Sequence, residues 1–249
     1  MSNNLNAATF GQSAECYAQA RPRYPPALFD WIAEIAPARV LAWDAGCGNG
    51  QATIDLASRF ERVIGTDSSE EQIRLAPATP GVEWQVASAE TANVPAGAVN
   101  AAIAANAFHW FDLARFFPRL QAALSREGVF VAFGYGSSVL PRGLQEHVSS
   151  AYAELKPYWA DGNRALWRGY RDLPFPLEEI EAPPFAIELS WTVTQWLDYT
   201  ATWSAYQRYK KETGRDPGPQ IADRIAPHWG LGEQPVSMPL TVRAGRGPN

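Results

Sequence analysis

Apolar and polar positions follow two alternating patterns through the first 135 residues. Short apolar runs of strand length cover 40–44, 62–67, 82–87, 98–105 and 128–133. Between the runs, apolar residues recur at the spacing of amphipathic helices, in 25–32, 51–57, 68–75 and 112–125. Strands that alternate with helices are typical of an α/β fold whose parallel sheet is covered by helices on both faces.

The pattern also predicts elements outside these runs, and it loosens from residue 140 onward. It predicts an opening helix over 10–20, a surface turn at 125–128, a helix over 148–158 and a sixth strand over 185–191. A long helix over 194–211 and a seventh strand over 236–242 follow, the strand antiparallel at or near an edge of the sheet. The tail from 243 to 249 is expected to fray.

A glycine-rich loop follows the first predicted strand. Gly46, Gly48 and Gly50 stand at alternate positions before a helix. Glycine tolerates positive φ and lets a ligand contact the backbone, and the free N–H groups of the next helix face the same point. Asp67 ends the second strand, 21 residues after Gly46, close to the spacing of a carboxylate that binds ribose hydroxyls. The two strands indicate a nucleotide-binding βαβ unit.

The spacing of these glycines argues against a dinucleotide. Dinucleotide loops read G-x-G-x-x-G and place a pyrophosphate at the helix N-terminus. Here the loop reads G-x-G-x-G, and Asp44 precedes it by two residues. A carboxylate at this position would repel a pyrophosphate but suits a ligand that carries an ammonium group. An NAD-dependent oxidoreductase is therefore disfavoured.

Composition narrows the class of protein. The 249 residues are 46% hydrophobic and 19% charged, typical of one α/β domain with insertions and not of a disordered chain. The net charge of −5 and the lack of any Lys or Arg run argue against nucleic acid as partner. Without a signal peptide or an apolar stretch of eighteen residues, we expect a cytoplasmic protein that contacts no membrane. Two Cys and three His, none in ligand spacing, predict no metal site.

Five motifs resemble the class I S-adenosylmethionine-dependent methyltransferases. The likeness is strongest to the small-molecule branch with trans-aconitate methyltransferase and the fungal cantharidin-detoxifying enzymes. The motifs are Tyr17-x-x-x-Arg21-Pro22-x-Tyr24-Pro25, Asp44-x-Gly46-Cys47-Gly48-x-Gly50, Gly65-x-Asp67, Ala87-Ser88-Ala89-Glu90 and Ala107-Phe108-His109-Trp110-Phe111-Asp112. The resemblance implies a Rossmann-like, seven-stranded methyltransferase sheet, mostly parallel with one antiparallel strand, flanked by helices and covered by a helical cap.

The resemblance also implies four parts of the chain. Residues 1–36 would form an N-terminal helical arm over the cofactor, and 37–136 the cofactor-binding core. A helical insertion or cap would span 137–184. C-terminal strands with a helical insertion, 185–249, would complete the sheet and the cap. No feature of the sequence predicts the oligomeric state.

The expected cofactor is S-adenosylmethionine. Tyr17 and Arg21 would close its methionine end, Arg21 by pairing with the carboxylate, unless Tyr17 only packs a capping arm. Ser88 stands where the family often has an aspartate for the adenine amino group, so that bond would be weaker. The full set implied for the cofactor is Tyr17, Arg21, Asp44, Ala45, Gly46, Gly48, Gly50, Asp67, Ser68, Ser88, Ala89, Glu90 and Asn106.

The acceptor would lie at the end of the fourth strand. His109 is the candidate general base, against the alternative that it only bonds the loop backbone. Arg164, Arg168 and Arg171 could clamp a carboxylate or could be solvated surface charges. Six of the ten Trp lie in the second half and are expected mainly in the core, with an aromatic-lined pocket as the alternative. The residues implied for the substrate are His109, Trp110, Tyr135, Arg168 and Trp203.

These features predict methyl transfer to a small-molecule acceptor at oxygen, either a carboxylate or a hydroxyl, by in-line displacement. Methylation at nitrogen or carbon remains an alternative within the same class of enzyme. A catalytically silent module that binds the cofactor is the alternative from another class.

Overall fold

The first half of the chain folds into the parallel sheet that its apolar pattern predicts. The computed structural model describes residues 21–247, so the expected helix over 10–20 and Tyr17 lie outside the described residues. The strands of this half are β1 (Leu41–Ala45), β2 (Arg62–Asp67), β3 (Val82–Val86), β4 (Val99–Ala105) and β5 (Leu124–Tyr135). Its helices are α3 (Pro26–Ile35), α4 (Gln51–Ala57), α5 (Glu70–Leu75), the 3-10 turn η1 (Phe108–Trp110) and α6 (Leu113–Ala123).

The sheet runs in the order β3-β2-β1-β4-β5-β8-β6, with β7 paired to β8 off this path. From β1 the chain moves outward to β2 and β3, and it then returns to place β4 on the other side of β1. The strand order therefore reverses between β1 and β4. Open α/β sheets bind ligands outside the carboxyl ends of the strands at such a switch point. This places the glycine loop after β1 at the expected crevice.

The central strands are buried on both faces, which explains why they read as continuous apolar runs. All five residues of β1 are buried. Phe29 of α3 packs with Phe133 on one face, and Phe116 of α6 packs with Trp43 on the other. Asn100 of β4 is structural, because its Oδ1 accepts hydrogen bonds from the N–H groups of Val40 and Leu41 at 3.2 and 3.1 Å.

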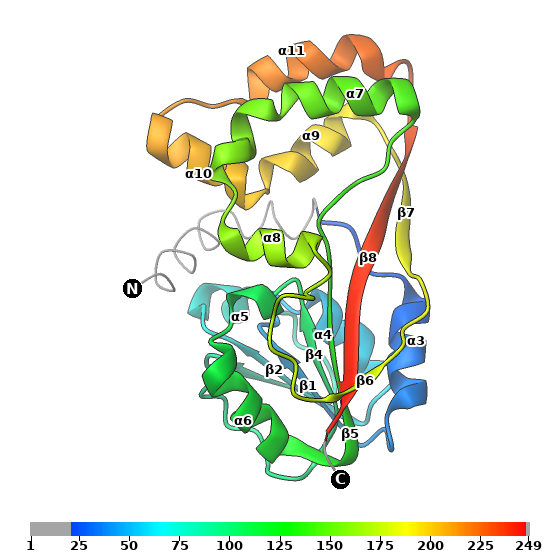
Figure 1. Ribbon diagram of the computed structural model, residues 1–249, viewed down its shortest axis with the longest axis vertical. Helices are drawn as coiled ribbons and strands as arrows, with labels where there is room; N and C mark the ends of the chain where they lie inside the picture. The colour runs from blue at the N-terminus through cyan, green and yellow to red at the C-terminus, as the bar shows by residue number, and fades with distance from the viewer. Residues whose placement is uncertain (1–20, 248–249) are drawn as a thin grey trace.

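The C-terminal strand is longer than its pattern predicts. β8 (Gln234–Arg246) pairs antiparallel with β5 through Leu240–Arg246 and with β7 (Ala186–Trp191) through Gln234–Pro239. Figure 1 shows β8 running along most of the length of the molecule. The expectation of a frayed tail from 243 is wrong for 243–246, because β5 on one side and β6 (Glu178–Ile180) on the other bond this segment.

The predicted sheet is confirmed, with two differences in its strands. Among the described strands, β8 alone runs against the others, as the single antiparallel strand was expected to do. The last place in the sheet belongs to β6, which is three residues long and polar and which the sequence did not predict. The expected turn at 125–128 instead belongs to β5, where the register shifts between Val99 and Ala101 and Glu127 has φ of 62°.

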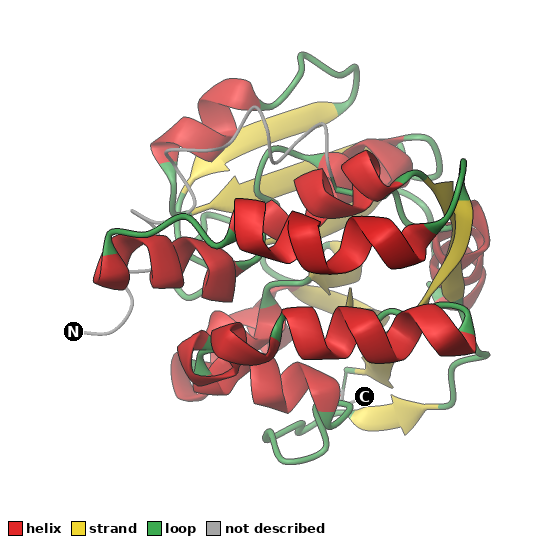
Figure 2. Ribbon diagram, turned by 90° about the horizontal axis from the view of Figure 1, so that it is seen from above, coloured by secondary structure: helices red, strands yellow, loops and turns green. Residues whose placement is uncertain are grey.

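Helices from the second half form a cap beyond the carboxyl edge of the sheet, drawn above it in Figure 1 and seen from above in Figure 2. They are α7 (Arg142–Ala151), the 3-10 segment η2 (Ala153–Tyr158), α8 (Asp161–Trp167), α9 (Val193–Ala201), α10 (Ser204–Thr213) and α11 (Gly218–Trp229). The helix expected over 148–158 is wrong in its bounds. It begins after Pro141 and gives way after Ala151 to a 3-10 segment that contains Pro157.

The long helix expected over 194–211 is two helices. Trp203 has an extended backbone, with φ of −65° and ψ of 138°, and separates α9 from α10. The Thr202 hydroxyl donates to the Tyr199 carbonyl at 2.6 Å and so caps the end of α9. The helical spacing of the aromatic residues continues across the break, so this spacing could not reveal that the helix is interrupted. Within residues 21–247, no helix is long and apolar enough to cross a bilayer.

Candidate functional site

Two cavities lie at the carboxyl edge of the sheet. The first has a volume of about 400 Å³ and the second about 90 Å³. They share Asn106, Trp110 and Tyr135 in their walls. Asn106 comes at the end of β4 with φ of 51°, and its Oδ1 accepts a hydrogen bond from the Tyr135 N–H at 3.2 Å. The two cavities therefore meet where β4 and β5 end.

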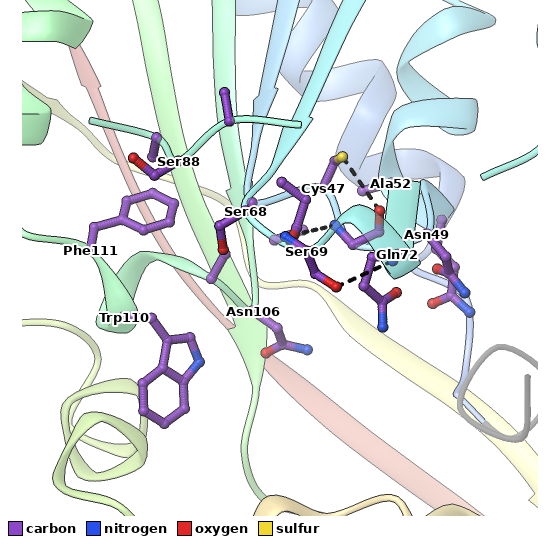
Figure 3. A pocket seen from close by; sticks show the side chains of 18 of the residues that line it. Cys47, Asn49, Ala52, Ser68, Ser69, Gln72, Ser88, Asn106, Trp110 and Phe111 are labelled. Atoms are coloured by element: carbon purple, nitrogen blue, oxygen red, sulfur yellow. Dashed lines mark hydrogen bonds between the residues drawn. The ribbon is translucent and has the colours of Figure 1, made fainter. Parts of the chain in front are cut away.

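The first cavity lies beside the glycine loop (Figure 3). Gly46 and Gly48 have φ of 73° and 55°, the left-handed region that favours glycine. A Cβ at Gly46 would lie 2.7 Å from the Cβ of Ala107, so only glycine leaves the loop this close to the end of β4. The residues in its wall are Tyr24, Gly46, Cys47, Gly48, Asn49, Gln51, Ala52, Asp67, Ser68, Ser69, Gln72, Ala87, Ser88, Ala89, Glu90, Ala105, Asn106, Ala107, Trp110, Phe111 and Tyr135.

Asp67 lines the first cavity at the end of β2. Its Oδ2 accepts a hydrogen bond from the Gly48 N–H at 2.9 Å, and its Oδ1 accepts one from the Ser69 N–H at 2.8 Å. Burial raises the pKa of the Asp67 carboxyl, and these two N–H groups act in the opposite direction. The carboxylate thus braces the glycine loop and still faces the cavity.

Asp44 is placed differently from its expected position beside a ligand. The residue is fully buried and lies outside the wall of the first cavity, as do Ala45 and Gly50. Its Oδ2 accepts a hydrogen bond from the Thr53 hydroxyl at 2.7 Å, whereas its Oδ1 has no partner among the described residues. Burial raises the pKa of Asp44 to about 7.

This pKa predicts that Asp44 makes stability depend on pH. A folded-state pKa above the ordinary 3.8 means that the folded chain holds the proton more tightly, so stability falls as pH rises toward 7. Asp44→Asn keeps the group neutral, and its free energy of unfolding relative to the natural protein should rise by about 3 kcal/mol from pH 5 to pH 8. Urea denaturation at each pH measures this. Asp30→Asn is the control, because that carboxylate is exposed. A constant difference between Asp44→Asn and the natural protein would contradict the prediction.

Five further residues expected at the cofactor lie in the wall of the first cavity. Ser88 and Thr91 exchange a hydrogen bond at 3.0 Å, and Glu90 Oε1 accepts one from the Asp112 N–H at 2.8 Å, at the start of α6. Ser68, Ser88, Ala89, Glu90 and Asn106 all contribute to the wall. Their roles toward a cofactor stay predictions.

Several wall residues were not among the expected ones. Cys47 and Asn49 stand inside the glycine loop, so the loop itself was the signal that could have found them. Tyr24 and Gln72 come from the segment before α3 and from α5, and no local pattern connects them to the loop.

Arg21 lines the second cavity and is absent from the wall of the first, where it was expected. Its Nη1 donates to the Tyr135 hydroxyl at 3.4 Å and its Nη2 to the Thr202 carbonyl at 3.3 Å. The guanidinium carbon lies 5.8 Å from the Tyr135 ring centroid and 5.6 Å from that of Tyr199, within cation–π range.

Aromatic side chains build most of the second cavity. Trp159 lies between Trp167 and Trp203, with ring centroids 5.2 and 5.5 Å away. The break between α9 and α10 brings Trp203 and Ser204 into the same wall. In contrast, Trp191, Trp196 and Trp229 are buried in the core. The tryptophans therefore divide into two groups: Trp159, Trp167 and Trp203 line a pocket, and Trp191, Trp196 and Trp229 lie in the core.

His109 lines the second cavity together with Trp110, whose ring centroid lies 4.7 Å away. Its Nδ1 lies 3.2 Å from the hydroxyl oxygen of Tyr170. Burial lowers the pKa of His109 to about 4, so the imidazole is neutral at physiological pH.

Arg168 does not reach either cavity, which corrects its expected place at the substrate. Its side chain is 64% exposed and pairs with Asp172 at 3.0 Å, one turn along the chain. Arg164 is also exposed and pairs with Asp161. These charges lie on the outer side of α8 because the inner side presents Leu166 to the core.

The first cavity fits an adenosine-containing ligand with an amino-acid portion. A carboxylate that ends β2 can accept ribose hydroxyls, and the positive-φ loop leaves room for a ligand against the backbone. Within residues 21–247, no group of three or more His, Cys, Asp or Glu is arranged to hold a metal ion.

Comparison with known proteins agrees with this geometry. Residues 43–132 match the family model of a methyltransferase domain. A solved structure named as a type II methyltransferase, from Anaeromyxobacter dehalogenans, is 43% identical with a TM-score of 0.84, over 91% of this chain and 97% of that one. A methyltransferase of Dictyostelium discoideum is 29% identical over 87% of this chain and 84% of its own length.

Two further matches limit what the fold alone implies. The S-adenosylmethionine-dependent methyltransferase CRG1 of Saccharomyces cerevisiae is 29% identical, but over only 48% of this chain and 44% of its own length. The [4+2]-cyclase SpnF is 13% identical with a TM-score of 0.55, over 97% of each chain. A protein named for a different reaction therefore has the same fold, and the chemistry of the site must be argued from its residues.

Proposed function

This chain belongs to the class I S-adenosylmethionine-dependent methyltransferases, and from that premise we propose that it methylates an oxygen atom of a small-molecule acceptor bound in the second cavity. One observation carries the proposal: the two cavities meet at Asn106, Trp110 and Tyr135. Methyl transfer requires the donor and the acceptor to approach along one line, and two sites that share a wall provide such a line. We propose that the branch of small-molecule enzymes named above is the right one for this chain.

The donor supplies an activated methyl group on a sulfonium sulfur, which leaves as a neutral thioether. The first cavity would hold this donor, with Asp67 on its ribose and the backbone of Gly46 and Gly48 beside its amino-acid portion. Trp110 and Tyr135 line both cavities, so in this proposal their rings would flank the line of transfer and help to exclude water from it. Alignment of two bound reactants can lower a barrier by about 7–11 kcal/mol in favourable cases.

The polarity of the second cavity favours a carboxylate over a hydroxyl. Arg21 is the charged residue in its wall, and a guanidinium presents a fork of N–H donors that matches a carboxylate. A carboxylate also needs no base. Two buried oxygens in the same wall, Asn163 Oδ1 and Ser204 Oγ, have no partner among the described residues and could bond further polar groups of the acceptor.

The test follows labelled methyl from S-adenosylmethionine into a panel of small carboxylic acids, alcohols, phenols and amines. We expect methyl esters from at least one acid. For that acid, Arg21→Gln should raise KM about 10- to 150-fold, because a charge-assisted hydrogen bond contributes about 1.5–3 kcal/mol. Affinity for S-adenosylmethionine, measured by calorimetry, should change far less.

Arg168→Gln is the matched control, since the same substitution is made at an exposed arginine outside both cavities. If the labelled methyl group were found only on nitrogen or carbon atoms, the proposal that the enzyme methylates oxygen would be rejected. Tight binding of S-adenosylmethionine without transfer to any acceptor would favour the silent module. An unchanged KM in Arg21→Gln would reject the carboxylate clamp.

A further inference from the structure

We infer that Tyr170 holds His109 in the tautomer protonated at Nε2, so that His109 presents a hydrogen-bond donor to the second cavity and not a base. The inference about the tautomer stands on the contacts of these two side chains alone. Its consequence for catalysis rests on the proposed function, because that proposal makes the second cavity the acceptor site.

Tyr170 is fully buried, and within the described residues 21–247 its hydroxyl has one hydrogen-bond partner, the Nδ1 atom of His109 at 3.2 Å. A buried hydroxyl leaves its proton without an acceptor only at a cost, so the hydroxyl donates to the one acceptor within reach. If Nδ1 carried the proton and donated to Tyr170, the tyrosine O–H would have no acceptor. The hydrogen-bond inventory therefore makes Nδ1 the acceptor.

A neutral imidazole has one N–H group, so the proton of His109 lies on Nε2. The low pKa of His109, about 4, keeps the ring neutral at physiological pH. His109 lines the second cavity, and no described residue bonds its Nε2. The Nε2–H group is therefore the polar group that His109 can offer to an acceptor.

The tyrosine is held in place by its backbone and its ring. Tyr170 has φ of 59°, a conformation uncommon for residues other than glycine. Its carbonyl accepts a hydrogen bond from Arg243 of β8 at 2.6 Å, and its N–H donates to the Ala165 carbonyl at 2.8 Å. Its ring packs edge-on against Phe108 with centroids 5.3 Å apart. Tyr170 thus acts as a positioning residue that connects His109 to the sheet.

The chemistry of methyl transfer decides which atom of the acceptor the Nε2–H group of His109 can usefully bond. A lone pair of one carboxylate oxygen forms the new O–CH₃ bond, the S–CH₃ bond breaks with its electron pair going to sulfur, and no proton moves. The attacking oxygen loses negative charge, so a donor bound to it would slow the reaction. The Nε2–H of His109 is therefore useful on the other oxygen. A hydroxyl acceptor would have to lose its proton to a group other than His109.

The experiment is ¹⁵N NMR of the full-length protein with labelled histidine, without any acceptor. The chain has three histidines, and loss of one set of signals in His109→Gln assigns those of His109. Between pH 6 and 8, we expect its Nε2 to show the shift of a protonated nitrogen and its Nδ1 that of an unprotonated one. The reverse pattern, or an even mixture of tautomers, would overturn the inference.

Tyr170→Phe adds a second readout. The other titratable side chains in the wall of the cavity are Arg21, Tyr135 and Tyr199, which this variant leaves in place. Without the hydroxyl that donates to Nδ1, the ¹⁵N shifts of neutral His109 should move from those of the Nε2–H form toward those of a mixture of tautomers. Shifts that stayed at the values of the Nε2–H form would mean that Tyr170 does not set the tautomer. Tyr158→Phe, which removes a hydroxyl outside both cavities, should leave these shifts unchanged.

The two proposals can fail separately. If no acceptor receives label in the panel, the proposed function fails while the tautomer can still be observed in the free protein. If the tautomer is reversed, methylation of the panel is unaffected, and His109 returns as a candidate base for hydroxyl acceptors. Should Tyr170→Phe fail to fold, the spectrum of the natural protein decides the inference by itself.

Discussion

Alanine at position 67 is expected to weaken binding of S-adenosylmethionine by about 5- to 150-fold, the equivalent of roughly 1–3 kcal/mol. Two losses combine in this variant. The expected partner of the ribose hydroxyls disappears from the wall of the first cavity. In addition, the N–H groups of Gly48 and Ser69 lose the carboxylate oxygens that they bond at 2.9 and 2.8 Å, so the glycine loop is less well held.

Isothermal titration calorimetry measures this affinity, and two further variants separate the causes. Asp67→Asn keeps the shape and one acceptor oxygen, so it should bind the donor with intermediate affinity. Asp30→Ala removes an exposed carboxylate of α3, which pairs with Arg59 at 2.8 Å, and serves as the control for loss of a carboxylate outside the cavity. If Asp67→Ala bound S-adenosylmethionine as tightly as the natural protein, the assignment of Asp67 to the ribose would be wrong.

Replacing Gly46 by alanine should affect both stability and donor binding. The residue has φ of 73°, a conformation that costs a residue with a Cβ about 1–2 kcal/mol. The new Cβ would also lie 2.7 Å from the Cβ of Ala107, and overpacking of this kind costs about 1–3 kcal/mol. We expect the free energy of unfolding to fall by about 2–5 kcal/mol and the affinity for S-adenosylmethionine to fall with it.

Gly97→Ala is the matched control for this substitution. Gly97 has φ of 64°, but a Cβ there would meet no atom within 4 Å, so it reports the backbone cost alone. Urea denaturation of both variants and calorimetry with the donor give the comparison. Gly97→Ala should bind S-adenosylmethionine normally. Equal destabilisation of the two variants, with normal donor affinity in both, would show that Gly46 and Ala107 do not form a close contact at the site.

Local pattern was sufficient for the elements that surround the first cavity. The strands β1 and β2 are short apolar runs. β1 ends at Ala45, directly before Gly46, and β2 ends at Asp67; glycine and aspartate are both depleted in strands. The glycines between them need positive φ, which the structure shows at Gly46, Gly48 and Gly50. These features depend on neighbours within a few residues, so the sequence displays them directly.

Local pattern was insufficient for the second cavity. Arg21, Trp203 and Tyr135 come from three distant parts of the chain, and they meet only because β8 and the cap fold over the end of β5. The aromatic spacing that predicted one helix over 194–211 continues across Trp203, where the backbone turns. Arg164 of α8 and Arg168 directly after it are basic residues that suit a clamp, yet both side chains lie in solvent because Leu166 occupies the buried side of the helix.

The sequence by itself determined the α/β class, the glycine loop and the acid at the end of β2 that lines the first cavity, because each depends on periodicity or backbone conformation over a short span. Only the tertiary structure decided which charge lines the second cavity, that Asp44 is sealed behind the loop, and that a buried tyrosine contacts His109. Those outcomes depend on burial and on contacts between residues far apart in the chain, such as Arg21 and Thr202, which are 181 positions apart. Neither property can be computed from local spacing, because desolvation and hydrogen-bond partners exist only once the chain has folded.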